Sequence, residues 1–252
     1  MRYQNVCIES LAYVLPDETI SSDEIERRLE PLYRRLRLPE GRLELMTGIR
    51  ERRFWEPDAL PSVKSIASGE LAIAAAGIDR REIGLLIHGS VCRDHLEPAT
   101  ACRVHHGLGL RRGCVLYDVS NACLGLMNGI LQAANMIELG QIRAALVLGT
   151  ESSRPLVETT IEALNRDLGW TRTSIKSAVA SLTIGSAGAA ILLTDRKTSR
   201  SPAATCPPCK PIASVTGNAT APVLPSQGNV TKSRSGVKPN DSSISLRCAA
   251  PT

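Results

Sequence analysis

Cys123 is the residue whose type and position most directly suggest chemistry. It follows the short apolar run Val115–Val119 and the turn Ser120-Asn121-Ala122, and a long apolar segment follows it. This order predicts a buried strand, a tight turn, and a helix with Cys123 in its first turn. Unpaired backbone N–H groups and the positive end of the helix dipole favour a thiolate there, so Cys123 is a candidate nucleophile.

The alternative for Cys123 is a buried structural cysteine. We give that interpretation to four other cysteines, namely Cys7, Cys92, Cys102 and Cys114. The chain has eight cysteines without the spacing of a disulfide framework, and we expect it in a reducing compartment. No disulfide is therefore predicted.

The segment that begins at Cys123 predicts a central helix. Residues 123–139 are apolar on nearly every helical face, and Gly125, Gly129, Ala133 and Ala134 would let neighbours approach closely. We expect this helix to be buried in the centre of the domain and to end at Gly140.

Segments with strand and helix character alternate through the first 200 residues, which is typical of a layered α/β domain. The first strand is predicted at Val6–Val14, and Ser21 and Glu24 have the spacing of a capping box at a helix start. Short apolar runs of the length of strands covered on both faces lie at Ile83–Ser90, Val115–Val119, Ala144–Gly149 and Ala189–Leu193. Further helices are expected near Ser65–Ala76, Thr100–Leu108 and Val157–Leu168.

The last 52 residues have a different composition. They contain five Lys and Arg against Asp241 alone, so they carry most of the net charge of +5, and they hold eight prolines and no aromatic residue. Such a segment cannot bury enough apolar surface to offset its ordering entropy. We predict a domain at 1–200 and a disordered tail rich in Pro, Ser and Thr at 201–252.

Neither a metal site nor a nucleic-acid or membrane partner is expected. Cys206 and Cys209 have zinc-ligand spacing, but only Cys248 follows them and no histidine follows His106. The basic tail lacks interleaved aromatics, which argues against nucleic-acid binding. The sequence shows neither a signal peptide nor a run of about 18 apolar residues, so we expect a cytoplasmic protein.

The run Asp118–Cys123 (DVSNAC) resembles the nucleophile motif of the thiolase superfamily, specifically of the beta-ketoacyl-ACP synthase III group. Three further segments agree with that group in order and spacing: Thr47–Arg53 (TGIRERR), Ala144–Ser152 (AALVLGTES) and Thr183–Leu193 (TIGSAGAAILL). The resemblance extends to about Ser199 and implies the N-terminal half of a thiolase-like, layered α/β/α fold.

The resemblance implies an acyltransferase that performs a Claisen condensation without a cofactor. Cys123 would accept an acyl group from a thioester of coenzyme A or acyl carrier protein, within a homodimer. The segment around Glu97 looks closer to the head-to-head condensing enzymes of long-chain olefin biosynthesis, in which a matching glutamate enters the partner's site as the proposed base. The alternative for Glu97 is an ordinary surface carboxylate.

Arginines near the TGI signature are candidates for substrate binding. Arg50, Arg52 and Arg53 could contact phosphates or phosphopantetheine, although a solvated basic turn is the alternative. Initiating synthases usually have an arginine where this chain has Met46, which separates it from them. We interpret three further histidines, His95, His105 and His106, as structural or surface residues, because their position before Cys123 matches no catalytic histidine of the family that the chain resembles.

The family's catalytic histidine and asparagine belong to a second half, to which nothing after Ser199 is similar. We therefore predict that the chain is inactive in condensation, and that its nucleophile helix exposes apolar surface. The abrupt loss of pattern after Leu193 suggests a change of reading frame or a truncated gene. A non-catalytic chain that binds acyl groups or partners is the alternative function.

Overall fold

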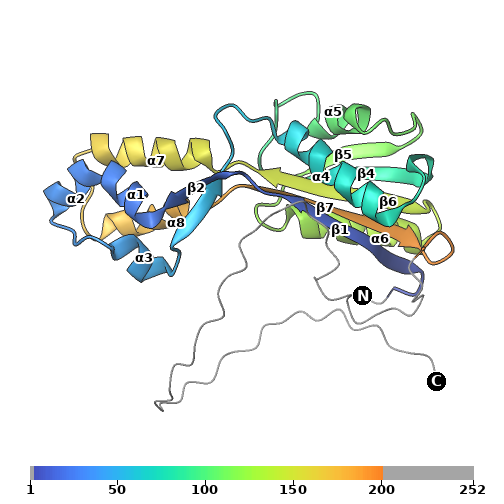
Figure 1. Ribbon diagram of the computed structural model, residues 1–252, viewed down its shortest axis with the longest axis horizontal. Coiled ribbons are helices and arrows are strands. Elements are labelled where there is room, and N and C mark those ends of the chain that lie inside the picture. The colour runs from blue at the N-terminus through green and yellow to red at the C-terminus, as the bar shows by residue number, and fades with distance from the viewer. Residues whose placement is uncertain (1–2, 201–252) are drawn as a thin grey trace, which may run out of the picture.

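The computed structural model describes residues 3–200, so the predictions for residues 201–252, Cys206 and Cys209 among them, lie outside the described residues. The described chain forms two lobes, a larger one built on a sheet and a smaller, mostly helical one (Figure 1). The chain passes between the lobes four times, because two separate segments form the smaller lobe. The first lies between Val14 and Pro61, and the second lies between Glu151 and Ala187.

The larger lobe contains a five-stranded sheet with the strand order β1-β7-β6-β4-β5. The strands β4, β5 and β6 are parallel, whereas β7 is antiparallel to both of its neighbours. Their bounds are β1 Val6–Val14, β4 Ile83–Gly89, β5 Val115–Val119, β6 Ala144–Glu151 and β7 Ala187–Asp195.

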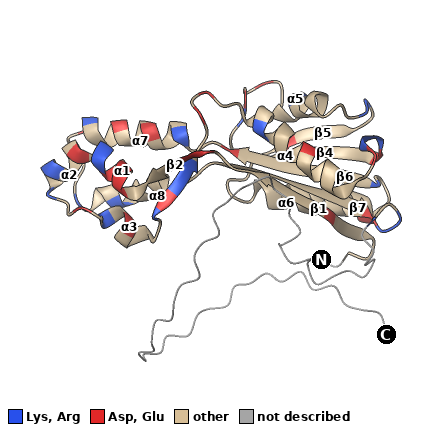
Figure 2. Ribbon diagram, in the orientation of Figure 1, with Lys and Arg blue, Asp and Glu red and all other residues tan. Residues whose placement is uncertain are grey.

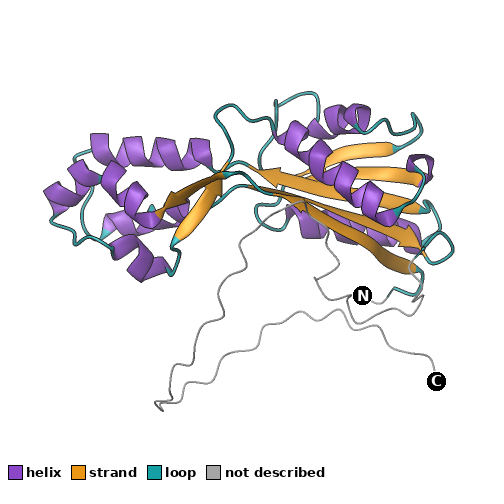
Figure 3. Cartoon of the chain, in the orientation of Figure 1, coloured by secondary structure: helices purple, strands orange, loops and turns teal. Residues whose placement is uncertain are grey.

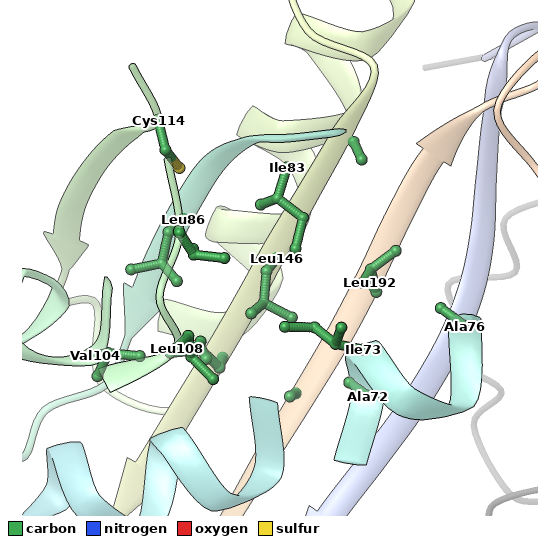
Figure 4. Close-up of a cluster of buried hydrophobic side chains, with 14 of the residues drawn as sticks. Ala72, Ile73, Ala76, Ile83, Leu86, Val104, Leu108, Cys114, Leu146 and Leu192 are labelled. Atoms are coloured by element: carbon green, nitrogen blue, oxygen red, sulfur yellow. The ribbon is translucent and has the colours of Figure 1, made fainter. Parts of the chain in front are cut away.

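Helices cover both faces of this sheet, which gives an α/β/α arrangement (Figure 3). On one face lie α4 (Pro61–Ala76) and α5 (Thr100–Gly107), and on the other lies α6 (Gly125–Glu138). The core between the sheet and α4 and α5 is closely packed with aliphatic side chains such as Leu86, Leu108 and Leu146 (Figure 4). A second cluster, with Ile87, Val147 and Ile137, lies under α6.

The smaller lobe pairs two short antiparallel strands with helices from distant parts of the chain. Its elements are β2 Glu18–Ser21, α1 Ser22–Arg28, α2 Glu30–Leu36, α3 Arg42–Thr47, β3 Glu51–Phe54, α7 Arg154–Arg166, η2 Ser174–Ser177 and α8 Val179–Thr183; the short η1, Arg80–Glu82, belongs to the larger lobe. Figure 2 shows Lys, Arg, Asp and Glu interspersed over the helices of the smaller lobe, while the strands of the large sheet carry few charges.

The layered α/β fold and its main elements are as predicted. The strands at Val6–Val14 and Val115–Val119 have the predicted bounds, and Ser21 caps α1 by accepting a hydrogen bond from the amide of Glu24 at 3.0 Å. The expectation that β5 is covered on both faces was wrong. This strand is only partly buried, because it forms the edge of the sheet and α6 packs chiefly over the neighbouring strands.

Candidate active site at the carboxyl ends of the parallel strands

Three parallel strands place the chemically interesting segments at one edge of the sheet. Gly89 at the end of β4 is in register with Val119 at the end of β5, and His88 is in register with Leu148 of β6. The segment with Glu97 follows β4, and the turn with Cys123 follows β5. The carboxyl edge of such a sheet is where α/β folds usually bind ligands, so this edge is the candidate site.

Cys123 lies in an exposed turn just before α6, which begins at Gly125. The expectation that Cys123 is in the first helical turn was therefore wrong by two residues. The reason is Ala122, which has a φ of 44° and bends the chain before the helix can begin at Leu124, the N-cap. A residue other than glycine is strained in this left-handed backbone conformation, and strained residues cluster at functional sites.

Three glycines fix the start of α6 against the sheet. A Cβ on Gly149 would stand 2.5 Å from the carbonyl oxygen of Gly89, and one on Gly89 would stand 2.7 Å from that of Gly125. The backbones of β4, β6 and α6 thus touch where larger side chains would separate them. This close approach holds the turn with Cys123 at a fixed height above the sheet.

The outer face of α6 is exposed, as expected for a nucleophile helix that no second half covers, so the expectation of a helix buried in the centre of the domain holds only for its inner face. Its small residues and Ile137 face the sheet, whereas Met127 is 46% exposed and the flanking Leu124 and Leu139 are 54% and 73% exposed. One helix on this face of the sheet leaves its outer side uncovered within the described chain. The predicted end at Gly140 is confirmed, since this residue has a φ of 70° directly after Leu139, the C-cap.

Glu97 is exposed on the segment between β4 and α5, near the tip of the loop. Its neighbour Leu96 is 84% exposed. The structure thus brings the Glu97 loop and the Cys123 turn to the same edge of the sheet. Whether Glu97 acts as a base stays a prediction.

The three candidate arginines have different surroundings. Arg50 is exposed, and Arg53 is partly buried and donates to the carbonyl oxygen of Pro16 at 2.8 Å. Arg52 is buried in the smaller lobe, where it donates to Ser22 Oγ at 3.0 Å, and burial lowers its pKa. This burial contradicts a solvated turn at Arg52 and favours a structural role there. Contact with substrate stays a prediction, and Arg50 has the freest side chain for it.

His88 is a residue that the sequence did not point to. It is fully buried on β4, and neither ring nitrogen has a hydrogen-bond partner in the described structure. Burial is the largest influence and lowers its pKa, while the nearby carboxylates of Asp118, Asp94 and Glu151 act in the opposite direction. One polar residue inside an apolar strand carries no periodic signal that would have revealed it.

The other cysteines and histidines are partly as expected. Cys114 is buried, and Cys7 and Cys92 are half-buried. Cys102 is exposed, so its interpretation as a core residue was wrong, because α5 buries Ala101 and Val104 and turns Cys102 outward. His95 and His106 are exposed, as a surface role requires, and His105 bonds to the carbonyl oxygen of Arg111 at 3.0 Å.

Residues 3–200 show neither a metal-binding cluster nor a membrane-spanning helix. No group of three or more His, Cys, Asp or Glu side chains there is arranged to hold a metal ion. None of the helices in that part of the chain combines the length and apolar character of a membrane span.

A layered sheet with a cysteine turn at its carboxyl edge, leading into a close-packed helix, is the architecture of a thiolase N-terminal domain. Residues 64–184 match the family model of the thiolase N-terminal domain. The chain therefore contains a thiolase N-terminal domain, and its described part has a thiolase-like mixed α/β fold.

Curated relatives indicate which thiolase-like enzymes the chain is similar to. The chain is 46% identical over 195 residues to an acyl-CoA:acyl-CoA alkyltransferase of Shewanella oneidensis, a match that covers 77% of this chain and 55% of the relative. It is 32% identical over 144 residues to a beta-ketoacyl-[acyl-carrier-protein] synthase III of Alkalilimnicola ehrlichii, covering 57% of this chain and 42% of the relative. The chain thus spans about half the length of these curated relatives.

Solved structures agree with the sequence matches. OleA of Xanthomonas campestris, crystallised as a variant with bound lauric acid and lauroyl-CoA, superposes with a TM-score of 0.73 at 37% identity. That match covers 77% of this chain and 58% of the OleA chain. The expected family and fold are confirmed.

Proposed function

We propose that Cys123 accepts an acyl group from an acyl thioester, as the first half-reaction of a condensing acyltransferase. The thiolate attacks the thioester carbonyl, a new carbon–sulfur bond forms, and the old carbon–sulfur bond breaks, so that coenzyme A or the carrier protein leaves as its thiolate. The observation that carries the proposal is the exposed Cys123 in a strained turn at the carboxyl edge of a thiolase-type sheet. The OleA structure with lauroyl-CoA supports a coenzyme A thioester as donor.

In the second half-reaction, Glu97 would remove a proton from the α-carbon of an acyl thioester. The resulting carbanion attacks the acyl carbonyl on the cysteine, and the thiolate of Cys123 leaves. We propose that Glu97 comes from the partner of a homodimer, as the resemblance to head-to-head condensing enzymes implies. Its exposure on a loop at the edge of the sheet supports this role.

We further propose that these 252 residues alone do not complete a condensation. The chain has four histidines and none follows His106, whereas the resemblance assigns the catalytic histidine and asparagine to a second half. A chain with Cys123 and without these partners can be acylated by a reactive thioester. It lacks the groups that would stabilise the condensation step.

Mass spectrometry of the chain after incubation with lauroyl-CoA tests the acylation. We expect one lauroyl group per chain, bound to the peptide that contains Cys123, and its loss in Cys123→Ser. Cys102→Ser is the matched control, because Cys102 is also exposed and free. Equal labelling of Cys123→Ser and the unchanged chain would contradict a specific acyl site.

A separate assay tests the condensation. Lauroyl-CoA is incubated with the 252-residue chain, and the extract is analysed for a beta-ketoacyl product. We expect none above the level of Cys123→Ser. A product that depends on Cys123 would show that residues of this chain replace the missing histidine and asparagine.

The second candidate function is a non-catalytic chain that binds acyl groups or partners through the outer face of α6. The observation in its favour is the exposure of Leu124, Met127 and Leu139. Size-exclusion chromatography with light scattering separates the candidates. A stable dimer favours the architecture of a condensing enzyme, whereas larger soluble assemblies favour an adhesive apolar face.

A further inference from the structure

Carboxylate side chains attach the loop that carries Glu97 to the sheet. The similarity to thiolase-like enzymes does not by itself assign a role to these carboxylates. This segment, Ser90–Ala101, runs from the end of β4 into the first turn of α5. Three carboxylates connect this segment to its surroundings. Two lie on neighbouring strands and accept hydrogen bonds from backbone amides of the segment, and the third lies in the segment and accepts from an amide of α4. They are Glu151, Asp118 and Asp94.

Glu151 holds the beginning of the loop. It is the last residue of β6, and its carboxylate accepts hydrogen bonds from the amides of Val91 at 2.9 Å and Cys92 at 3.3 Å. The amide of Ser90 donates to the carbonyl oxygen of Val119 at 3.1 Å. The first residues of the loop are thus bonded to both strands that flank β4.

Asp118 holds the end of the loop. Its two carboxylate oxygens accept from the amides of Thr100 at 2.8 Å and Ala101 at 2.9 Å, at the first turn of α5. Hydrogen bonds from backbone amides to a carboxylate are about twice as strong as those between neutral groups. Asp118 lies on β5, five residues before Cys123, so the strand that leads to the nucleophile also anchors the loop.

Asp94 secures the middle of the loop from inside. Its side chain is 3% exposed and accepts from the amide of Ser62 at 2.9 Å, at the start of α4. The amide of Asp94 donates to Thr100 Oγ1 at 3.3 Å. Only the tip remains outside this network, and Leu96 and Glu97 lie there in solvent.

We propose that Asp94, Asp118 and Glu151 are positioning residues that hold the loop rigid and so fix the direction in which Glu97 projects. This inference rests on the proposed function, in which Glu97 acts as the base. A base must be placed within hydrogen-bond distance of the proton that it removes, and a loop free to move would lose that placement. Two of these carboxylates lie on the strands β5 and β6, and the third bonds to the start of α4, so the loop is tied to three elements of the larger lobe.

The first experiment measures amide hydrogen exchange of the full chain in Glu151→Gln and Asp118→Asn. An amide side chain keeps the shape but offers one acceptor oxygen in place of two. We expect exchange in residues 90–101 to quicken by roughly tenfold or more, the factor that corresponds to losing a charge-assisted hydrogen bond. Glu138→Gln is the matched control, since Glu138 accepts from the amides of Gln4 and Asn5 far from this loop.

The second experiment follows the base itself. The chain is incubated in D2O with lauroyl-CoA in excess over Cys123, and mass spectrometry reports deuterium at the α-carbon of the unreacted lauroyl-CoA, the thioester from which Glu97 is proposed to remove a proton. We expect Glu97→Gln to abolish this exchange, and Glu151→Gln and Asp118→Asn to slow it roughly tenfold at an unchanged yield of acylation. The control Glu138→Gln should exchange like the unchanged chain.

The outcomes separate the two proposals. Unaltered amide exchange in both anchor variants would overturn the positioning role, as would faster loop exchange with an unaltered rate of deuterium uptake. If the unchanged chain is acylated but the unreacted lauroyl-CoA takes up no deuterium, the base role of Glu97 fails. In that case amide exchange alone decides whether the carboxylates hold the loop.

Discussion

The two lobes are stabilised in different ways. In the larger lobe, contiguous apolar strands pack under helices, and every residue of β4 is buried. In the smaller lobe, polar side chains join segments that are distant in sequence. The buried Arg154 forms ion pairs with Glu18 and Glu158 and donates to the carbonyl oxygen of Trp55 at 2.7 Å.

Glu26 shows the same design within the smaller lobe. Its buried carboxylate accepts from the amides of Gly41 at 2.7 Å and Leu43 at 2.5 Å and from the hydroxyl of Tyr33. The larger lobe is thus stabilised mainly by the burial of apolar side chains, which the hydrophobic pattern of the sequence indicates. The smaller lobe depends more on specific polar contacts between side chains and backbone groups, which the hydrophobic pattern does not indicate.

The lobes are nevertheless linked by chain topology. The strand β7 lies between β1 and β6 in the sheet, yet it follows the segment of α7, η2 and α8 in sequence. Pairing of β7 with β1 and β6 therefore requires the chain to return from the smaller lobe, after α7, η2 and α8, to the middle of the sheet. We expect the two lobes to unfold together.

Truncation of a core leucine in each lobe is the strongest test of this comparison. Leu146→Ala in the larger lobe and Leu32→Ala in the smaller lobe each remove a fully buried side chain. We expect each to lower the free energy of unfolding by about 2–5 kcal/mol. Urea denaturation followed by circular dichroism should show one transition in both variants, whereas a separate early transition in Leu32→Ala would show that the lobes unfold independently.

A glycine at the closest backbone contact gives a smaller effect within the larger lobe. Gly149→Ala would place a methyl group against the carbonyl oxygen of Gly89, so we expect a loss of about 1–3 kcal/mol in the free energy of unfolding. Because α6 would move, acylation of Cys123 should also slow. Gly140→Ala is the control for the acylation rate: its left-handed backbone makes this alanine destabilising as well, but it meets nothing within 4 Å and lies at the other end of α6 from Cys123.

The sequence revealed the elements whose stability depends on burial. The apolar runs at 83–90, 144–149 and 189–193 became central strands, because such runs can be satisfied only between two layers. The short strands β2 and β3 were not predicted. They are mostly polar, as in Glu51–Phe54, and their pairing depends on contacts with distant residues.

At the candidate site, the sequence indicated Cys123 and Glu97 through motifs, but it did not reveal their supports. The carboxylates of Asp118 and Glu151 lie within otherwise apolar strands, and their partners are backbone amides that any residue possesses. The start of α6 was misplaced for a similar reason. An apolar pattern marks the face of a helix, whereas the φ of Ala122 decides where the helix begins.

His88 should make the larger lobe sensitive to acid. Burial lowers its pKa in the folded chain below the value of 6.5 that it has when unfolded, so below pH 6.5 the unfolded chain binds the proton more readily. Stability is then complete above pH 6.5 and falls by up to about 1.4 kcal/mol per pH unit as the pH decreases toward the folded pKa. Urea midpoints between pH 5 and 7 should show a flatter profile in His88→Asn, while exposed His95→Asn should keep the original slope.

The smallest expected effect concerns a helix cap in the smaller lobe. The hydroxyl of Ser21 accepts from the amide of Glu24 at the start of α1, and the alanine variant would leave that amide without its partner. We expect Ser21→Ala to cost about 1 kcal/mol in the free energy of unfolding. Thr173→Ala is the matched control, because Thr173 precedes η2 without a side-chain capping bond. If the two variants have equal urea midpoints, the polar contacts of the smaller lobe contribute less than its packing, and the contrast between the lobes is weaker than their structures indicate.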